Sequence, residues 1–292
     1  MADGNLAPEA FGQLMAELRP RLHRYCARMV GSAFDGEDVV QEALIKATEA
    51  YAAAAGVDRP DRWLFRIAHN TALDALRRRK RQALVQSDAG LDDLADPVGA
   101  ADARVAATAS LATFLRLPPT PRACVVLIDV LDHSLAETAD ILGVSLATVK
   151  AALHRARARL PALAEAPETA PRLAAAEMAR LRAYADRFNA RDFDALRDLL
   201  AEDVKLDLAN RVRWAGRKDV SVYFTRYSTS SDWRFSPGLA DGRPALLVSD
   251  PADPADTPRY AVLLDWADGR IAAIRDYRFA LYVMEAVVLT RQ

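Results

Sequence analysis

Basic side chains suited to binding phosphate gather at one end of a predicted helix. Pro60 suits the first turn of this helix, and apolar residues recur after it at helical spacing. The helix ends in the run Arg77-Arg78-Arg79-Lys80-Arg81. The helix dipole favours cations at this end, but five in succession exceed what the dipole needs. We therefore expect these side chains to neutralise the phosphates of a nucleic acid.

Two further side chains of the same helix could contact bases. Trp63 could stack on an unpaired base, and Asn70 could hydrogen-bond to one. An isolated tryptophan is more often a core residue, so the core is the alternative position for Trp63.

A second DNA-binding element is predicted between residues 117 and 160. Ser134 and Glu137 have the spacing of a capping box, which starts a short helix. Gly143 can end that helix in the left-handed conformation, and Ser145 can cap the next helix. Two short helices joined by such a turn form a helix-turn-helix, whose second helix enters the DNA major groove.

The second of these helices has an apolar face and a basic end. We expect its inward stripe to be Leu146, Val149, Leu153, Ala156 and Leu160. The candidates for groove contact are Thr148, Ala151, His154 and Arg155, and those for phosphate contact are Lys150, Arg157 and Arg159. The alternative is a plain amphipathic helix pair with a solvated basic edge.

The sequence shows no group of residues with the types and spacing of a catalytic or metal-binding site. The two cysteines, Cys26 and Cys124, offer no disulfide framework, and His23 with Cys26 supplies only two metal ligands. We therefore expect neither a metal nor another cofactor. Asp207 could act as a base in a C-terminal cavity, but an exposed or salt-bridged Asp207 is the favoured reading. We expect no enzyme activity.

Charge is divided into blocks although the 292-residue chain has a formal net charge of −1. Residues 59–82 hold eight basic and two acidic residues, whereas residues 84–104 hold five aspartates and one arginine. This pattern predicts polyanion-binding surfaces separated by an acidic connector. The sequence shows no signal peptide and no apolar stretch long enough to span a bilayer, so we expect a cytoplasmic protein without membrane contact.

Apolar periodicity and breaker residues divide the chain into three folded parts. We predict a helical domain over residues 8–82, a linker over 83–105, the helix-turn-helix domain over 106–160, a linker over 161–171 and an α+β domain over 172–292. In the first domain, Pro20 is expected to open a second helical segment and Asp35 to cap a further helix.

Two helices followed by strands are expected in the last part. Strand candidates cover residues 204–208, 245–248, 260–266 and 270–277, and Asp268-Gly269 predicts a hairpin because both turn positions need positive φ. Three tryptophans of this part, Trp214, Trp233 and Trp266, could line a cavity or could belong to the core.

The first 160 residues resemble a bacterial extracytoplasmic-function (ECF) sigma factor. Residues 34–42 resemble the region-two helix that docks on the β′ clamp of RNA polymerase, and residues 62–81 resemble the helix that meets the minus-ten element. Residues 117–159 resemble region four, which reads the minus-thirty-five element. On the docking helix, the resemblance implies clamp contacts from Asp38, Gln41, Glu42, Ile45 and Glu49.

The last part resembles a SnoaL-like domain, a cone-shaped α+β fold shared with ketosteroid isomerases and small cyclases. Residues 188–196 carry this resemblance most clearly. Some sigma factors regulate themselves through such an extension, often with an Asp-Gly-Gly-Gly-Arg motif. Here Asp241-Gly242-Arg243-Pro244 is the nearest match and is shorter.

The fold expected for the whole chain is therefore multidomain: two all-α sigma domains, the second a helix-turn-helix, followed by an α+β cone. The implied function is promoter recognition and transcription initiation with core RNA polymerase, regulated in cis by the last domain. The implied partners are core RNA polymerase and promoter DNA, and a small ligand of the last domain stays open. Two alternatives are a ligand-responsive helix-turn-helix regulator and a SnoaL-like isomerase or cyclase with a DNA-binding part.

Overall fold

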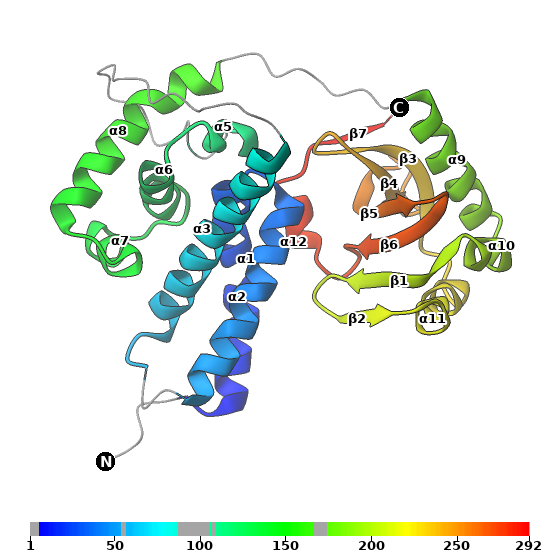
Figure 1. Ribbon diagram of the computed structural model, residues 1–292, viewed down its shortest axis with the longest axis horizontal. Coiled ribbons are helices and arrows are strands. Elements are labelled where there is room, and N and C mark those ends of the chain that lie inside the picture. The colour runs from blue at the N-terminus through cyan, green and yellow to red at the C-terminus, as the bar shows by residue number, and fades with distance from the viewer. Residues whose placement is uncertain (1–5, 54–56, 87–105, 107–108, 166–173, 292) are drawn as a thin grey trace. The chain divides into compact units, whose positions relative to one another are not determined.

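The computed structural model describes residues 6–53, 57–86, 106, 109–165 and 174–291. It divides into two compact units, Met1–Pro167 and Glu168–Gln292, each with its own hydrophobic core. Figure 1 labels the helices and strands of both units.

All the secondary-structure elements in the described residues of the first unit are helical. Its elements are α1 (Pro8–Val30), α2 (Ala33–Ala53), α3 (Pro60–Gln86), α5 (Leu111–Leu115), α6 (Pro119–Val125), a π-helical turn (Val126–Val130), α7 (Leu135–Leu142) and α8 (Leu146–Ala164). Helices α1, α2 and α3 lie side by side (Figure 1). Gly36 allows α1 and α2 to approach closely, because a Cβ at this position would lie 2.6 Å from the Cα of Ala27. One apolar core runs from these three helices into α5, α6 and α8.

Two predicted features of α1 and α2 are wrong. Pro20 lies inside a continuous α1 and opens no new segment. Helix α2 begins at Ala33, before Asp35, and the Ser32 hydroxyl accepts the hydrogen bond from the Asp35 backbone N–H at 3.2 Å. Asp35 therefore sits in the first turn, where it forms an ion pair with Arg79.

The helix ends also extend further than the apolar pattern indicated. Helix α3 runs four residues beyond residue 82, to Gln86. Helix α8 passes through Pro161 to Ala164, since a proline removes only one backbone donor from a helix that otherwise continues. The predicted linker residues 87–105 and 166–171 lie outside the described residues.

The second unit is an α+β domain built on a seven-stranded sheet. Its elements are α9 (Ala175–Asn189), α10 (Phe193–Asp198), β1 (Leu200–Leu208), β2 (Val212–Ala215), α11 (Arg217–Ser228), β3 (Arg234–Ala240), β4 (Arg243–Ser249), β5 (Pro258–Ala267), β6 (Arg270–Asp276), α12 (Leu281–Met284) and β7 (Leu289–Arg291). The strand order is β2-β1-β6-β5-β4-β3-β7. Strands β1 and β6 pair in parallel, and the other neighbours are antiparallel.

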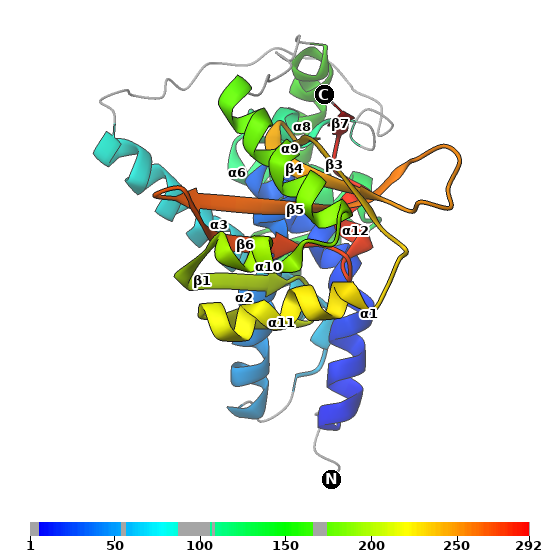
Figure 2. The ribbon, with the colours of Figure 1, turned by 90° about the vertical axis from the view of Figure 1, so that its right-hand side faces the viewer.

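Helices α9, α10 and α11 cover one face of this sheet (Figure 1 and Figure 2). Phe188 of α9 anchors the contact, because its ring stacks on Phe235 with 4.0 Å between centroids and meets Tyr227 and Trp233 edge to face. The β5–β6 hairpin turns at Asp268 and Gly269, whose φ angles are 49° and 75°, as the Asp-Gly pair predicted.

The predicted strands correspond to β1, β4, β5 and β6, with the last prediction one residue longer than β6, and β2, β3 and β7 were not foreseen. Strand β2 has only four residues, β7 has three, and β3 contains Pro237 and Gly238, which disfavour strands. Strand β2 pairs with β1 and β3 pairs with β4 across short turns, whereas β7 pairs with β3, which is distant in sequence.

Candidate nucleic-acid interface

The basic side chains at the end of α3 differ in their partners: Arg78 and Arg79 form ion pairs with α2, whereas Lys80 and Arg81 do not within the described residues. Arg78 forms an ion pair with Glu42 of α2 at 2.8 Å. Arg79 donates to the Val30 carbonyl at 3.0 Å and forms an ion pair with Asp35. These two arginines thus hold the end of α3 against α1 and α2.

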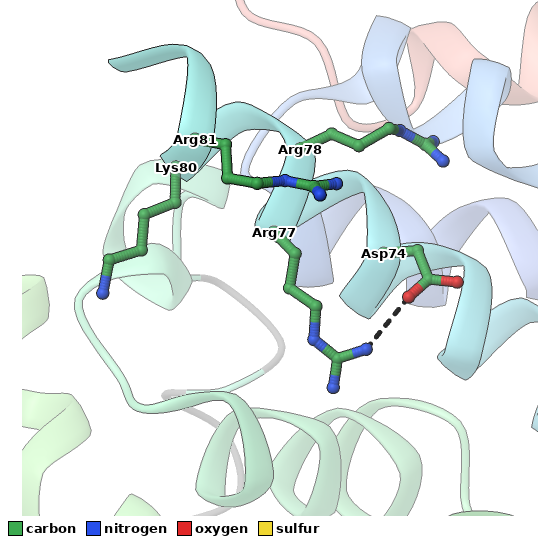
Figure 3. Close-up of a pocket in the computed structure, with 5 residues that line it drawn as sticks. All are labelled: Asp74, Arg77, Arg78, Lys80 and Arg81. Atoms are coloured by element: carbon green, nitrogen blue, oxygen red, sulfur yellow. Dashed lines mark hydrogen bonds and ion pairs between the residues drawn. The ribbon is translucent and has the colours of Figure 1, made fainter. Parts of the chain in front are cut away.

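Four side chains of the run, Arg77, Arg78, Lys80 and Arg81, line a surface hollow of about 550 Å³ together with Asp74 (Figure 3). Arg77 forms an ion pair with Asp74 at 2.9 Å. Lys80 and Arg81 are exposed, and neither forms an ion pair within the described part of the chain. Figure 3 shows Arg78 extending away from Lys80. The hollow therefore presents cationic groups to a polyanion.

The two candidate base-contacting residues of α3 differ in their surroundings. Trp63 is half-buried, and its ring lies 6.0 Å from the Tyr51 ring and 6.3 Å from the Phe11 ring. Its packing against the core matches the alternative that the sequence left open. Asn70 is exposed on α3.

The helix-turn-helix forms as its sequence predicts. Ser134 and Glu137 make both hydrogen bonds of the capping box, Gly143 ends α7 with φ 65°, and the Ser145 hydroxyl accepts from the Thr148 backbone N–H at 3.1 Å. On α8, the four groove candidates Thr148, Ala151, His154 and Arg155 are exposed.

Three details of α8 differ from the expectation or refine it. Leu146 is 44% exposed, so its place in the inward stripe was wrong, because the first residue of the helix precedes the turn that packs. Ala152 is fully buried and was missed. Arg157 bonds to Asp129 at 3.0 Å, and this bond raises the pKa of the arginine above its ordinary value. Lys150 is exposed, and Arg159 is half-buried.

The candidate polymerase-binding residues share one side of α2. Asp38, Ile45 and Glu49 are exposed, whereas Gln41 and Glu42 are half-buried. Ile45 is 51% exposed, which places an apolar group in a polar surface. Burial opposes ionisation of Glu42, but hydrogen bonds from Lys46 and Arg78 outweigh it and lower the pKa of this carboxyl. Glu42 thus links this side of α2 to the basic run of α3.

The carboxylate that sequence reasoning singled out in the second unit is salt-bridged. Arg213 lies opposite Asp207 on β2, and its Nε donates to Asp207 Oδ2 at 2.8 Å. Of the three tryptophans, Trp233 is a core residue with 5% exposure, whereas Trp214 and Trp266 are half-buried beside surface pockets.

A different carboxyl group, missed from the sequence, lies in the core of this unit. Asp276 is fully buried and accepts hydrogen bonds from the hydroxyls of Tyr223 and Tyr227 at 2.9 Å and 2.7 Å, and from the Arg278 backbone N–H at 2.8 Å. Burial raises the pKa of Asp276. No local motif marks it, because its hydroxyl partners are about 50 residues away.

The described ranges hold neither a metal-binding cluster nor a membrane-spanning helix. No three His, Cys, Asp or Glu side chains there gather in a way that could hold a metal ion. His23 instead bonds the Ala33 carbonyl at 2.9 Å, and Cys26 is fully buried. In the same ranges no helix is long and apolar enough to cross a membrane.

Three protein families match consecutive parts of the chain. Sigma-70 region 2 matches residues 14–82, sigma-70 region 4 matches residues 111–160, and the SnoaL-like domain matches residues 181–274. These matches cover the basic hollow, the helix-turn-helix and the α+β unit in turn.

Curated relatives extend the similarity to nearly the whole chain. ECF RNA polymerase sigma factor SigG of Mycobacterium tuberculosis (strain ATCC 25618 / H37Rv) is 30% identical over 307 residues, covering 92% of this chain and 82% of SigG. SigM of the same strain is 38% identical over 53% of this chain and 76% of SigM. The crystal structure of M. tuberculosis SigJ aligns with a TM-score of 0.35 and 22% identity, over 91% of this chain and 95% of SigJ.

The chain belongs to the ECF sigma factors of RNA polymerase, the class that recognises promoters and initiates transcription, and carries a C-terminal SnoaL-like domain.

Proposed function

We propose that promoter DNA is held at two places of the first unit, the hollow at the end of α3 and the exposed side of α8. The observation that carries this proposal is the division of the basic run. Arg78 and Arg79 brace α3 through ion pairs with α2, so they orient the helix and contact DNA only if these pairs exchange. Arg78 also lines the hollow, but Arg77, Lys80 and Arg81 line it without an ion pair to α2 and are the stronger candidates for phosphate contact.

At the upstream element, Thr148, Ala151, His154 and Arg155 contact the major groove, and Lys150 and Arg159 contact phosphates. The exposure of these groove candidates supports this assignment. Arg157 is already engaged with Asp129, so it stabilises α8 instead of contacting DNA directly.

Core RNA polymerase docks on α2 through Asp38, Gln41, Glu42, Ile45 and Glu49. Exposed Ile45 supports this proposal, because an apolar side chain at the centre of a polar surface contributes affinity when a partner buries it. Trp63 supports the fold through its packing, and Asn70 is the remaining α3 candidate for an unpaired base.

Assembly and initiation are tested together. Tagged full-length protein should retain core RNA polymerase in a pull-down, and the complex should give run-off transcripts from a cognate promoter. Failure to assemble holoenzyme would contradict the proposal. The helix-turn-helix would then indicate a DNA-binding regulator that acts without polymerase.

The phosphate-binding role of the hollow has its own test. Lys80→Ala with Arg81→Ala should lower the slope of log affinity against log salt by about two units, since each lost phosphate contact removes close to one. Arg180→Ala with Arg182→Ala removes the same charge from exposed positions of α9 and serves as the control. Equal slopes for the two double variants would contradict the assignment.

We also propose that the SnoaL-like unit regulates the sigma unit in cis. The support is its independent core together with a salt-bridged Asp207, which is a poor general base. A small ligand of this unit would then act by changing that regulation.

A further inference from the structure

One face of α3 continues the cationic surface of the terminal run toward the start of the helix. Arg62, Arg66, Asn70, Asp74, Arg77 and Arg81 follow one another at intervals of three or four residues, which places them on the same side of the helix. The C-terminal half of this face borders the open hollow. The N-terminal half, Arg62 and Arg66, contacts α7 of the helix-turn-helix.

Two carboxylates of α7 occupy this N-terminal half. Arg62 forms an ion pair with Glu137 at 2.9 Å and a longer one with Asp140 at 3.8 Å. Arg66 forms an ion pair with Asp140 at 3.1 Å and also donates to the Asp140 backbone carbonyl. Each guanidinium therefore faces anionic oxygens, the same kind of group that a DNA phosphate presents.

The acidic partner is held in place and charged. Glu137 accepts from the Ser134 backbone N–H and hydroxyl, each at 2.9 Å. The Ser134 hydrogen bonds, followed by those from Arg62, lower the pKa of Glu137 to about 2. Nearby, the His133 ring meets the Phe65 ring edge to face at 4.9 Å, and Arg21 donates to the Leu131 carbonyl at 2.9 Å.

We propose that Arg62 and Arg66 are two further DNA-binding residues of region two, and that Glu137 and Asp140 of region four cover them as substitutes for phosphate until promoter DNA is engaged. This inference rests on the proposed function, because it extends the phosphate-binding face of α3 and names what competes for it.

Promoter dimensions require the contact to break. The minus-ten and minus-thirty-five elements are separated by roughly 85 Å of duplex at about 3.4 Å per base pair. Helix α8, with 19 residues, is only about 28 Å long at 1.5 Å per residue. With α3 and α7 joined by ion pairs shorter than 4 Å, α3 and α8 cannot reach both elements together.

The ion pairs are suited to exchange with phosphates. The side chains of Arg66 and Asp140 are each 48% exposed, so water and salt weaken their attraction. Helices α5 and α6 also pack against α1 through apolar groups, so full separation needs the additional contacts that core polymerase supplies. The ion pairs between α3 and α7 therefore contribute part of the free energy needed to separate region two from region four.

The test compares charge-matched variants of the full chain. Glu137→Gln with Asp140→Asn removes both anionic partners and keeps the capping box, which accepts Gln as well as Glu. Glu17→Gln with Glu165→Gln removes two exposed carboxylates elsewhere and changes net charge equally. Affinity for a fluorescent promoter duplex is measured by anisotropy without polymerase over a salt series.

We expect the α7 variant to bind DNA roughly three- to tenfold more tightly than the control variant at low salt, with a steeper salt dependence. Labels on Gln13→Cys and Ala162→Cys, both at exposed positions, should report lower energy transfer in the α7 variant. Circular dichroism establishes that both variants stay folded. Equal affinity and equal energy transfer in the two variants would overturn the inference.

A charge swap between Arg66 and Asp140 tests separately whether these residues pair with each other and whether Arg66 contacts DNA. Arg66→Glu with Asp140→Arg restores an ion pair with no change in net charge, so energy transfer should stay near that of the parent. In holoenzyme this swap should weaken promoter binding and lower the salt slope by about one unit, because Arg66 is lost. Unchanged holoenzyme binding would remove Arg66 from the DNA contacts. Failure of the parent chain to form holoenzyme would instead count against the proposed function.

Discussion

At the scale of single residues, two arginines two positions apart on α8 have different roles. Arg155 is exposed on the groove side, whereas Arg157 is bonded to Asp129. We expect Arg155→Ala to weaken promoter binding by about 1–3 kcal/mol if the guanidinium contacts a base, or to lower the salt slope by about one unit if it contacts a phosphate.

Binding isotherms at several salt concentrations measure both quantities. Arg157→Ala is the matched control, and its main effect should be on the thermal stability of the first unit. If Arg155→Ala changed neither affinity nor salt slope, the assignment of this side of α8 to DNA would be wrong.

Arg122 shows how one buried cation stabilises a junction of helices. It is 4% exposed and donates to the carbonyls of Leu115, Leu117 and Met29, and Met29 lies in the last turn of α1. Burial lowers the pKa of Arg122 to about 10, so it stays protonated at neutral pH. Arg122→Met would leave these carbonyls without their donor.

We expect Arg122→Met to lower the free energy of unfolding by about 3 kcal/mol or more, since buried acceptors lose a charged partner. Urea unfolding followed by circular dichroism measures this loss. Arg116→Met removes one exposed donor to the Leu163 carbonyl and should cost less than about 1 kcal/mol. Similar losses for both variants would contradict the proposed stabilising role of Arg122.

At the scale of elements, two buried histidines make the packing of α1 with α2 and α3 sensitive to acid. His23 bonds the Ala33 carbonyl, and His69 Nδ1 lies 2.7 Å from the Tyr25 hydroxyl. Burial lowers the pKa of each to about 4, below the ordinary value near 6.5. Between these values the unfolded chain binds more protons than the folded chain, so the free energy of unfolding falls as pH falls.

At pH 5 the expected loss is roughly 2 kcal/mol for each histidine relative to pH 7.5. Calorimetry of the full chain at both pH values should show the unfolding transition of the first unit move to lower temperature. His69→Gln keeps a hydrogen-bonding group without a titrating one, so its transition should move less. A shift as large as that of the parent would exclude His69 as a source of the effect.

Local signals predicted elements well where one short motif decides the outcome. Capping residues Ser134 and Ser145, the turn at Gly143 and the Asp268-Gly269 hairpin are all as expected, because each acts within a few residues. Positions set by distant partners could not be predicted. Asp276 and its tyrosines, the bracing of Arg79 by Asp35, and the contact of Arg62 with Glu137 depend on residues 44 to 75 positions apart.

At the scale of the whole molecule, each unit has a core of its own, so regulation in cis can be tested by separating them. A chain ending at Pro167 keeps the complete first unit. If the SnoaL-like unit couples to promoter use with the usual strength of allosteric coupling, run-off output should change by at least about fivefold on its removal.

The strongest form of this experiment uses one preparation before and after cleavage. A protease site placed between residues 167 and 172 lets the same molecules be assayed intact and cut, with core polymerase in saturating amount. A rise in output on cleavage would make the SnoaL-like unit an inhibitor, and a fall would make it an activator. Adding the free second unit back at high concentration should partly reverse either change, because the linker only raises its local concentration. Identical transcript yields from intact and cut protein would mean that the second unit does not regulate initiation.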